Sequence, residues 1–84
     1  METRLNDLFL RLSNKGFLPI EIPDLIKDFY YLIENDRCST MSSIDQELED
    51  LGWGIGVMDN VTYELTTSLV ENTGFSYVER HIRN

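Results

Sequence analysis

The sequence is poor in the residues that most catalytic and metal sites need. Its 84 residues include one cysteine, Cys38, and one histidine, His81. A single cysteine excludes a disulfide within the chain, and a reducing cytoplasm is the expected compartment. One histidine excludes a histidine-based metal cluster within one chain. No pair of acids stands in a recognisable catalytic pattern, so we expect no enzymatic activity, no metal and no cofactor.

Long apolar runs are also missing. No stretch approaches the ~20 apolar residues of a membrane-spanning helix. The first twelve residues mix acids with apolar residues and lack a small-residue cleavage site, so they do not have the pattern of a signal peptide. Linkers, low-complexity tracts and solenoid-length repeats are lacking too. The sequence therefore predicts one small domain over residues 1–84, without a membrane partner.

Basic residues are missing from half of the chain. The net charge is −8, and residues 38–77 contain seven acids but no lysine or arginine. Nucleic-acid affinity comes mostly from lysine and arginine on phosphates, so nucleic acid is not an expected partner of this half. An acidic field instead suits a protein with a basic surface. The alternative interpretation is that these charges serve solubility alone.

What the sequence does contain is helical periodicity. Apolar residues recur at helical spacing over residues 22–33, and Pro23 suits the first helical turn. This segment is the most apolar in the chain, so we expect it to be the central helix. Shorter amphipathic helices are expected over residues 3–15, 43–51 and 60–72.

A repeated pattern predicts the helix ends. Leucine or valine, three residues, glycine and an aromatic residue occur in that order at Gly16, Gly52 and Gly74. Glycine takes a left-handed conformation without strain, so each glycine is expected to end a helix with positive φ. The aromatic residue after it would fold back on the helix, and Trp53 is expected to be buried in this way against Leu48 and the central helix.

Polar residues predict the helix starts. Ser43, followed by Gln46, has the form of a capping box. Asp59 or Asn60 is expected to cap the next helix, with Val61 on its inward face.

The C-terminal segment, residues 75–84, fits two structures. Helix is favoured by Ser76 and Glu79, which form another capping-box pattern, but the segment also suits a strand beside Ile55–Val57. The fold class expected is all-α, a compact array of four to five short helices, with that one very short strand pair as a possible addition.

Two loops have the outline of a ligand site without its chemistry. Residues 52–56 are glycine-rich, but they follow a helix and have no lysine nearby, so they do not suit a nucleotide phosphate. Residues 36–47 have the length of an EF-hand loop, but Met41 stands where calcium loops need glycine.

A helix-turn-helix is the main alternative to a protein-binding role. Residues 44–72 have something of that form, although the second helix carries no basic residue. A nucleic-acid-associated regulator would have to use basic residues near the termini: Arg4, Arg11, Lys15, Arg80 and Arg83.

The favoured function is a small acidic protein-interaction module, a regulator, inhibitor or adaptor that docks on a basic partner. Four acids lie within six residues of the third helix, and several apolar residues are expected on outward helix faces. Tyr31, or Tyr63 with Val70, would also suit a weak homodimer. The candidate partner-binding residues are Asp45, Glu47, Glu49, Asp50, Tyr31, Tyr63 and Val70.

Overall fold

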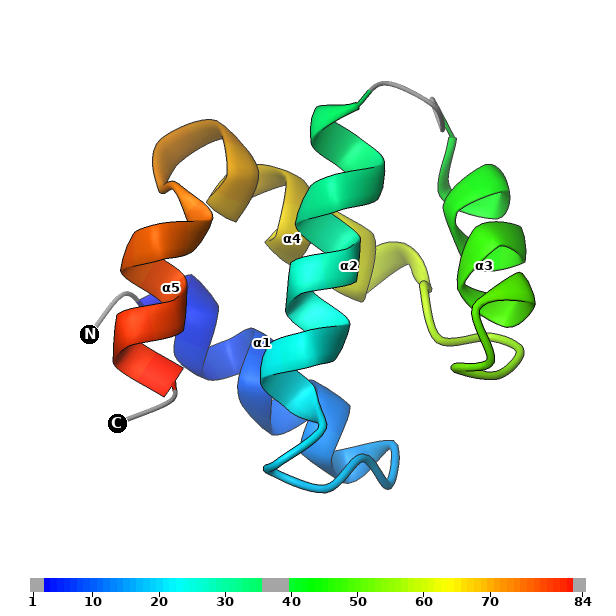
Figure 1. Cartoon of the computed structure of the whole chain (residues 1–84), viewed down its shortest axis with the longest axis horizontal. Helices are drawn as coiled ribbons and strands as arrows, with labels where there is room; N and C mark the ends of the chain where they lie inside the picture. The colour runs from blue at the N-terminus through cyan, green and yellow to red at the C-terminus, as the bar shows by residue number, and fades with distance from the viewer. Residues whose placement is uncertain (1–2, 36–39, 83–84) are drawn as a thin grey trace.

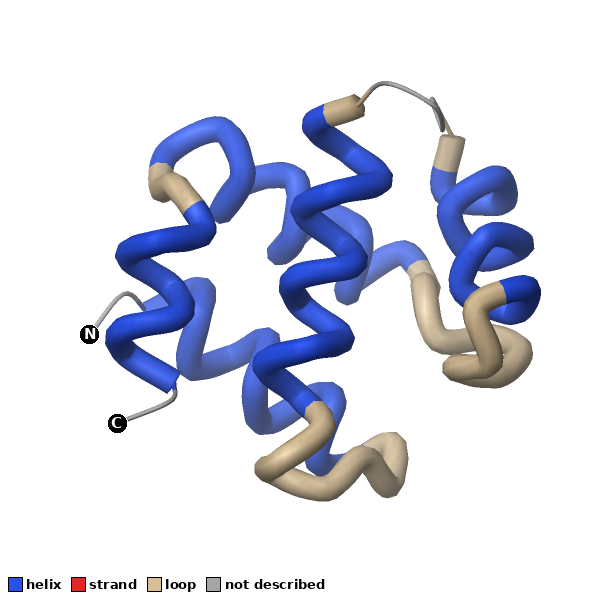
Figure 2. Tube along the Cα trace, in the orientation of Figure 1, coloured by secondary structure: helices blue, strands red, loops and turns tan. Residues whose placement is uncertain are grey.

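Five α-helices make up the computed structural model, which describes residues 3–35 and 40–82. They are α1 (Thr3–Asn14), α2 (Ile22–Glu34), α3 (Met41–Asp50), α4 (Asn60–Asn72) and α5 (Phe75–Ile82), labelled in Figure 1. The fold is all-α, and no strand occurs among the described residues (Figure 2). The suggested strand pair is therefore not borne out, because the C-terminal segment forms the helix α5. None of the five helices is long and apolar enough to cross a membrane.

The most apolar segment is the central helix, as predicted. α2 packs against each of the other four helices. In Figure 1 it runs between α5 and α3, with α1 and α4 behind it. Because α2 is covered on several sides, its buried face is wide. The buried residues of α2 are Ile22, Pro23, Leu25, Ile26, Phe29, Tyr30 and Leu32.

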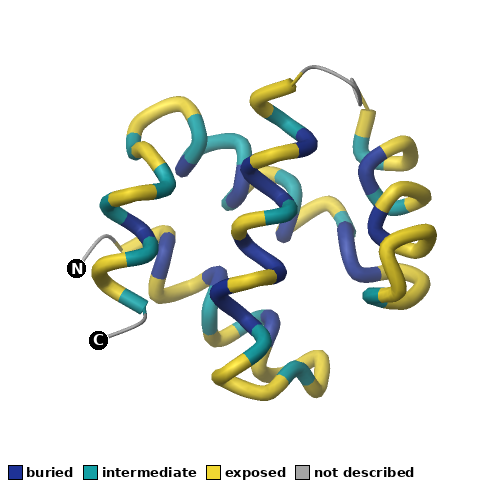
Figure 3. Tube along the Cα trace, in the orientation of Figure 1, coloured by how far each residue is buried: buried dark blue, intermediate teal, exposed yellow. Residues whose placement is uncertain are grey.

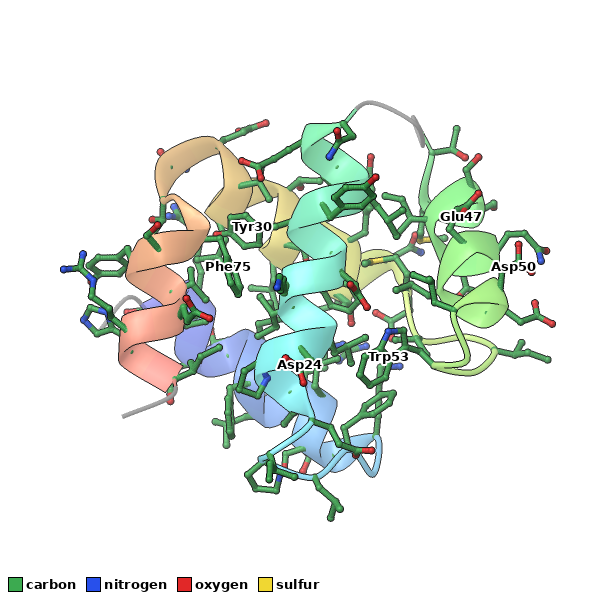
Figure 4. All side chains as sticks on the ribbon, viewed as in Figure 1. Asp24, Tyr30, Glu47, Asp50, Trp53 and Phe75 are labelled. Carbon is green, nitrogen blue, oxygen red and sulfur yellow. The ribbon has the colours of Figure 1, made fainter. Side chains whose placement is uncertain are left out.

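Tyr30 extends the buried face of α2 beyond the expected stripe. Its side chain is 1% exposed, and its hydroxyl donates a hydrogen bond of 2.9 Å to the carbonyl oxygen of Thr73. The rings of Tyr30 and Phe75 lie 5.4 Å apart between α2 and α5 (Figure 4). Burial, and then the nearby carboxylate of Glu34, raise the pKa of Tyr30 to about 12. This tyrosine therefore joins α2 to the turn between α4 and α5.

The other helices each turn one face toward α2, as the buried segments in Figure 3 show. On α4 the inward face differs from the prediction, because Val61 is 47% exposed while Thr62 and Thr66 are fully buried. The Thr66 hydroxyl donates to the carbonyl oxygen of Thr62 at 2.7 Å, and Arg11 Nε donates to the Thr62 hydroxyl at 3.1 Å. These hydrogen bonds satisfy the buried hydroxyl groups. The two threonines are therefore tolerated on the buried face of α4, where the apolar pattern predicted Val61.

Two of the three predicted glycine corners are confirmed. Gly16 and Gly52 have φ of 106° and 95°. The N–H groups of the following aromatic residues, Phe17 and Trp53, donate back to the last turns of α1 and α3 at 3.3 and 2.9 Å. The two rings then meet edge to face, with centroids 6.1 Å apart. The corners after α1 and α3 therefore pack against each other.

The prediction for the third glycine was wrong. Gly74 is not among the glycines with positive φ, and Thr73 already ends α4 in an extended conformation. The carbonyl oxygen of Gly74 accepts the N–H groups of Tyr77 and Val78, at 3.2 and 3.3 Å. Gly74 therefore begins α5 instead of ending α4.

One of the three predicted helix caps is confirmed. Ser76 does not cap α5, because that helix already begins at the residue before it. Asp59 caps α4, and its carboxylate accepts the N–H of Thr62 at 2.8 Å. The prediction of Ser43 as the cap of α3 was wrong, because the cap lies three residues earlier than expected. Thr40 caps it instead, and its hydroxyl accepts the N–H of Ser43 at 3.1 Å.

Candidate functional site

An open groove between α2 and α3 brings together two of the predicted partner-binding residues. Its volume is about 420 Å³, and the side chains of Tyr31 and Leu51 at its edge are 52% and 56% exposed. Glu47 lines it from α3, so Tyr31 and Glu47 share one surface as a binding site would require. The full lining is Asp28, Tyr31, Leu32, Glu47 and Leu51. We call this surface the α2/α3 groove.

Asp28 and Leu51 were not predicted as site residues. Asp28 lies on the half-buried flank of α2, where it accepts a hydrogen bond of 2.7 Å from the indole N–H of Trp53. Trp53 itself lies beside α2 (Figure 4). Its side chain is half-buried and so is more exposed than predicted. The bond fixes a carboxylate at the groove wall, and it makes Trp53 a neighbour of the site. Leu51 stands at helical spacing from Ile44 and Leu48, which predicts a buried position, so the sequence gives no signal of its exposure.

The four acids of α3 divide into two groups. Glu47, Glu49 and Asp50 are exposed, and Asp50 lies on the side of α3 turned away from α2 (Figure 4). Asp45 is half-buried, and its carboxylate accepts the N–H groups of Gly56 and Met58 at 3.2 and 3.1 Å. Asp45 therefore holds the loop between α3 and α4 in place.

The remaining predicted residues lie elsewhere. Tyr63 and Val70 are half-buried on α4, where they pack against the core. Neither lines the α2/α3 groove. Their burial reduces the apolar area that a homodimer through Tyr63 and Val70 would use.

Two basic residues of the alternative function, Arg11 and Lys15, are paired within the chain. Asp59 Oδ2 lies 2.9 Å from Arg11 Nη2 and 2.8 Å from Lys15 Nζ. Burial opposes ionisation of Asp59, but hydrogen bonds from Lys15, the Thr62 N–H and Arg11 outweigh it and hold the pKa of that carboxyl well below its usual range. Both cations thus share one carboxylate within the chain. The connection over residues 51–59 is also longer than the three- or four-residue turn of a helix-turn-helix.

Three residues with reactive or basic side chains remain. Arg83 and Cys38 lie outside the described residues. His81 is on α5, where its Nδ1 is 2.8 Å from the carbonyl oxygen of Tyr77 and its ring lies 4.1 Å from the Tyr77 ring. Within residues 3–35 and 40–82, no group of three or more histidine, cysteine or acidic residues is placed to hold a metal ion.

The α2/α3 groove combines exposed apolar side chains with carboxylates. The sequence of α2 contains three acids and one base, and the sequence of α3 contains four acids and no base. No family model, curated protein or solved structure matches the chain. Function is therefore inferred from what this groove is able to bind: exposed aromatic and aliphatic side chains beside carboxylates suit an apolar side chain flanked by lysine or arginine.

Proposed function

We propose that this protein is a non-enzymatic interaction module that docks a basic segment of a protein partner in the α2/α3 groove. The observation that carries the proposal is the juxtaposition of Tyr31 and Leu51, both about half exposed, with the carboxylates of Asp28 and Glu47. An amphipathic helix with an apolar stripe between basic residues is the partner segment that matches this pattern.

Three physical effects support binding there. The exposed apolar side chains gain from being removed from water, at roughly 25 cal/mol per Å². The acids of α3 attract a basic segment and raise its rate of association at low salt. The hydrogen bond from Trp53 to Asp28 fixes one of the groove's charges before the partner arrives, which reduces the entropy lost on binding.

The first experiment uses synthetic helical peptides without tryptophan. One peptide carries leucine on one face and lysine elsewhere, and its control has glutamate in place of lysine. Titration is followed by the emission of Trp53, the single tryptophan, which lies beside the groove. We expect the lysine peptide to bind with an affinity that falls as salt is raised, and the glutamate peptide not to bind.

Matched variants locate the binding. Tyr31→Ser with Leu51→Ser is expected to weaken the lysine peptide about tenfold or more, because apolar anchors dominate such contacts. Leu10→Ser with Val61→Ser removes similarly exposed residues from another face, 53% and 47% exposed, and should leave binding unchanged. Equal loss in both double variants would refute a site in the α2/α3 groove.

A second pair of variants separates local charge from net charge. Glu47→Gln with Glu49→Gln removes two acids from α3, and Glu64→Gln with Glu71→Gln removes two exposed acids from α4. The proposal requires slower association and a flatter salt dependence for the α3 variant only. If both variants behave alike, the acids act through net charge and solubility, and α3 has no special role.

A further inference from the structure

A second apolar surface lies between α1 and α4, away from the α2/α3 groove. It is an open groove of about 480 Å³, in which Leu10 and Val61 are 53% and 47% exposed and Leu65 is half-buried. Asp7, Arg11, Asn14 and Lys15 complete the lining. We call this surface the α1/α4 face. Val61 belongs to it because the neighbouring Thr62 takes the buried position in the first turn of α4.

The α1/α4 face is electrically neutral in a strongly acidic chain. Its lining carries one acid, Asp7, and two bases, Arg11 and Lys15, and both bases are paired with Asp59. These four charges cancel, so the whole net charge of −8 comes from the rest of the molecule. One turn beyond the groove, Arg4 on α1 and Glu64 on α4 are exposed and add one charge of each sign.

We infer that the α1/α4 face is a self-association surface, on which a second copy of this chain docks. Two copies with a net charge of −8 each repel one another, and the repulsion is smallest where neutral faces meet and the acidic helices point apart. A basic partner is not attracted to this face, because the face carries no net negative charge. The inference is independent of the proposed function, because it uses other residues and a different partner.

Charge placement along α1 also fits a two-fold contact. In a symmetric dimer the same patch meets itself, and a helix that crosses the two-fold axis at a right angle runs antiparallel to its copy. With the axis near Arg11, the Asp7 end of each α1 faces the Lys15 end of the other, and Leu10 meets apolar residues of the partner copy. Opposite charges then meet at both ends of the contact.

The available area makes this dimer weak. A standard stable interface buries roughly 800 Å² on each partner. The whole chain exposes 4998 Å², so such an interface needs about a sixth of its surface, far more than the α1/α4 face supplies with Leu10, Val61 and Leu65. We therefore expect dimers that appear only as protein concentration rises.

The test is sedimentation equilibrium of the full chain over a wide concentration range, with a reductant present to keep Cys38 from forming intermolecular disulfides. Leu10→Ser with Val61→Ser should weaken dimerisation about tenfold or more, while Tyr31→Ser with Leu51→Ser should leave it unchanged. Added salt should strengthen the dimer, since it screens repulsion between acidic chains. That dependence is opposite in sign to the one expected for a basic peptide in the α2/α3 groove.

Three results would overturn the inference. They are a monomer at the highest concentration reached, a dimer weakened equally by both double variants, and a dimer weakened only by the Tyr31 and Leu51 substitutions. Circular dichroism of each variant verifies folding, and these exposed positions should change stability little.

Discussion

Replacing Asp59 tests whether one carboxylate holds α1 against α4. Its oxygens cap α4 through the N–H of Thr62 at 2.8 Å and pair with Arg11 and Lys15 at 2.9 and 2.8 Å. Loss of a cap costs about 1 kcal/mol. Each partly exposed ion pair adds roughly 0.2–1 kcal/mol. Asp59→Ala is therefore expected to lower the free energy of unfolding by about 2 kcal/mol.

Asp59→Asn separates the two contributions, because asparagine is as good a cap as aspartate but has no charge. It should lower the free energy of unfolding by about 1 kcal/mol, and high salt should reduce the effect. Urea unfolding, followed by Trp53 emission and circular dichroism, measures both variants. An asparagine variant as stable as the parent at pH 7 would show that the ion pairs contribute nothing. Equal stability of the two variants would rule out the cap.

The pH dependence of the same variant gives a second measurement. The folded pKa of Asp59 lies below its usual value, so the unfolded state binds a proton first as pH falls. The stabilisation by the ionised carboxylate is complete above the unfolded pKa of about 4 and is lost progressively as pH falls below it toward the folded pKa. The difference between the parent and Asp59→Asn should be full at pH 7 and shrink below about pH 4. A constant difference from pH 7 to pH 2 would contradict the reasoning.

Two further predictions concern a tyrosine and two glycines. Tyr30→Phe should lower the free energy of unfolding by about 1–2 kcal/mol, because the Thr73 carbonyl loses its donor. Because the pKa of Tyr30 is about 12 when folded and about 10 when unfolded, the parent should lose stability between these pH values, and the phenylalanine variant should lose less. Gly52→Ser should destabilise by about 1–2 kcal/mol, since φ is 95° there, although an added Cβ meets nothing within 4 Å. Gly74→Ser, at the start of α5, should be neutral or stabilising, and thermal unfolding of the pair compares them.

The elements with strong periodic signals were predictable from sequence. The apolar spacing of residues 22–33 identified the central helix, and the glycine corners at Gly16 and Gly52 were correct. The same corner pattern failed at Gly74, because a glycine before an aromatic residue either ends one helix or begins the next. Three hydroxyl residues within residues 40–43 offered competing caps for α3, and the sequence alone did not identify Thr40.

The candidate site was predicted only in part, because it depends on contacts between distant residues. Tyr31 and Glu47 were identified from helical geometry and charge, and they do share a groove. Asp45 resembled its acidic neighbours in sequence, but its hydrogen bonds reach 11 and 13 residues along the chain. The pairing of Asp28 with Trp53 spans 25 residues and has no local signal.

α3 lies at the edge of the fold and is expected to open more readily than the central helix α2. It packs mainly against α2 and contributes only Ile44 and Leu48 to the buried core (Figure 1). Local unfolding follows such differences in buried contact, so the amides of α3 should exchange with solvent through smaller openings than those of α2. The loop after α3 is hydrogen-bonded to α3 through Asp45 and to α2 through the bond between Trp53 and Asp28. These bonds limit how far α3 moves away from α2. We therefore expect that a small outward movement of α3 can widen the α2/α3 groove for a side chain of the proposed partner without unfolding the other four helices.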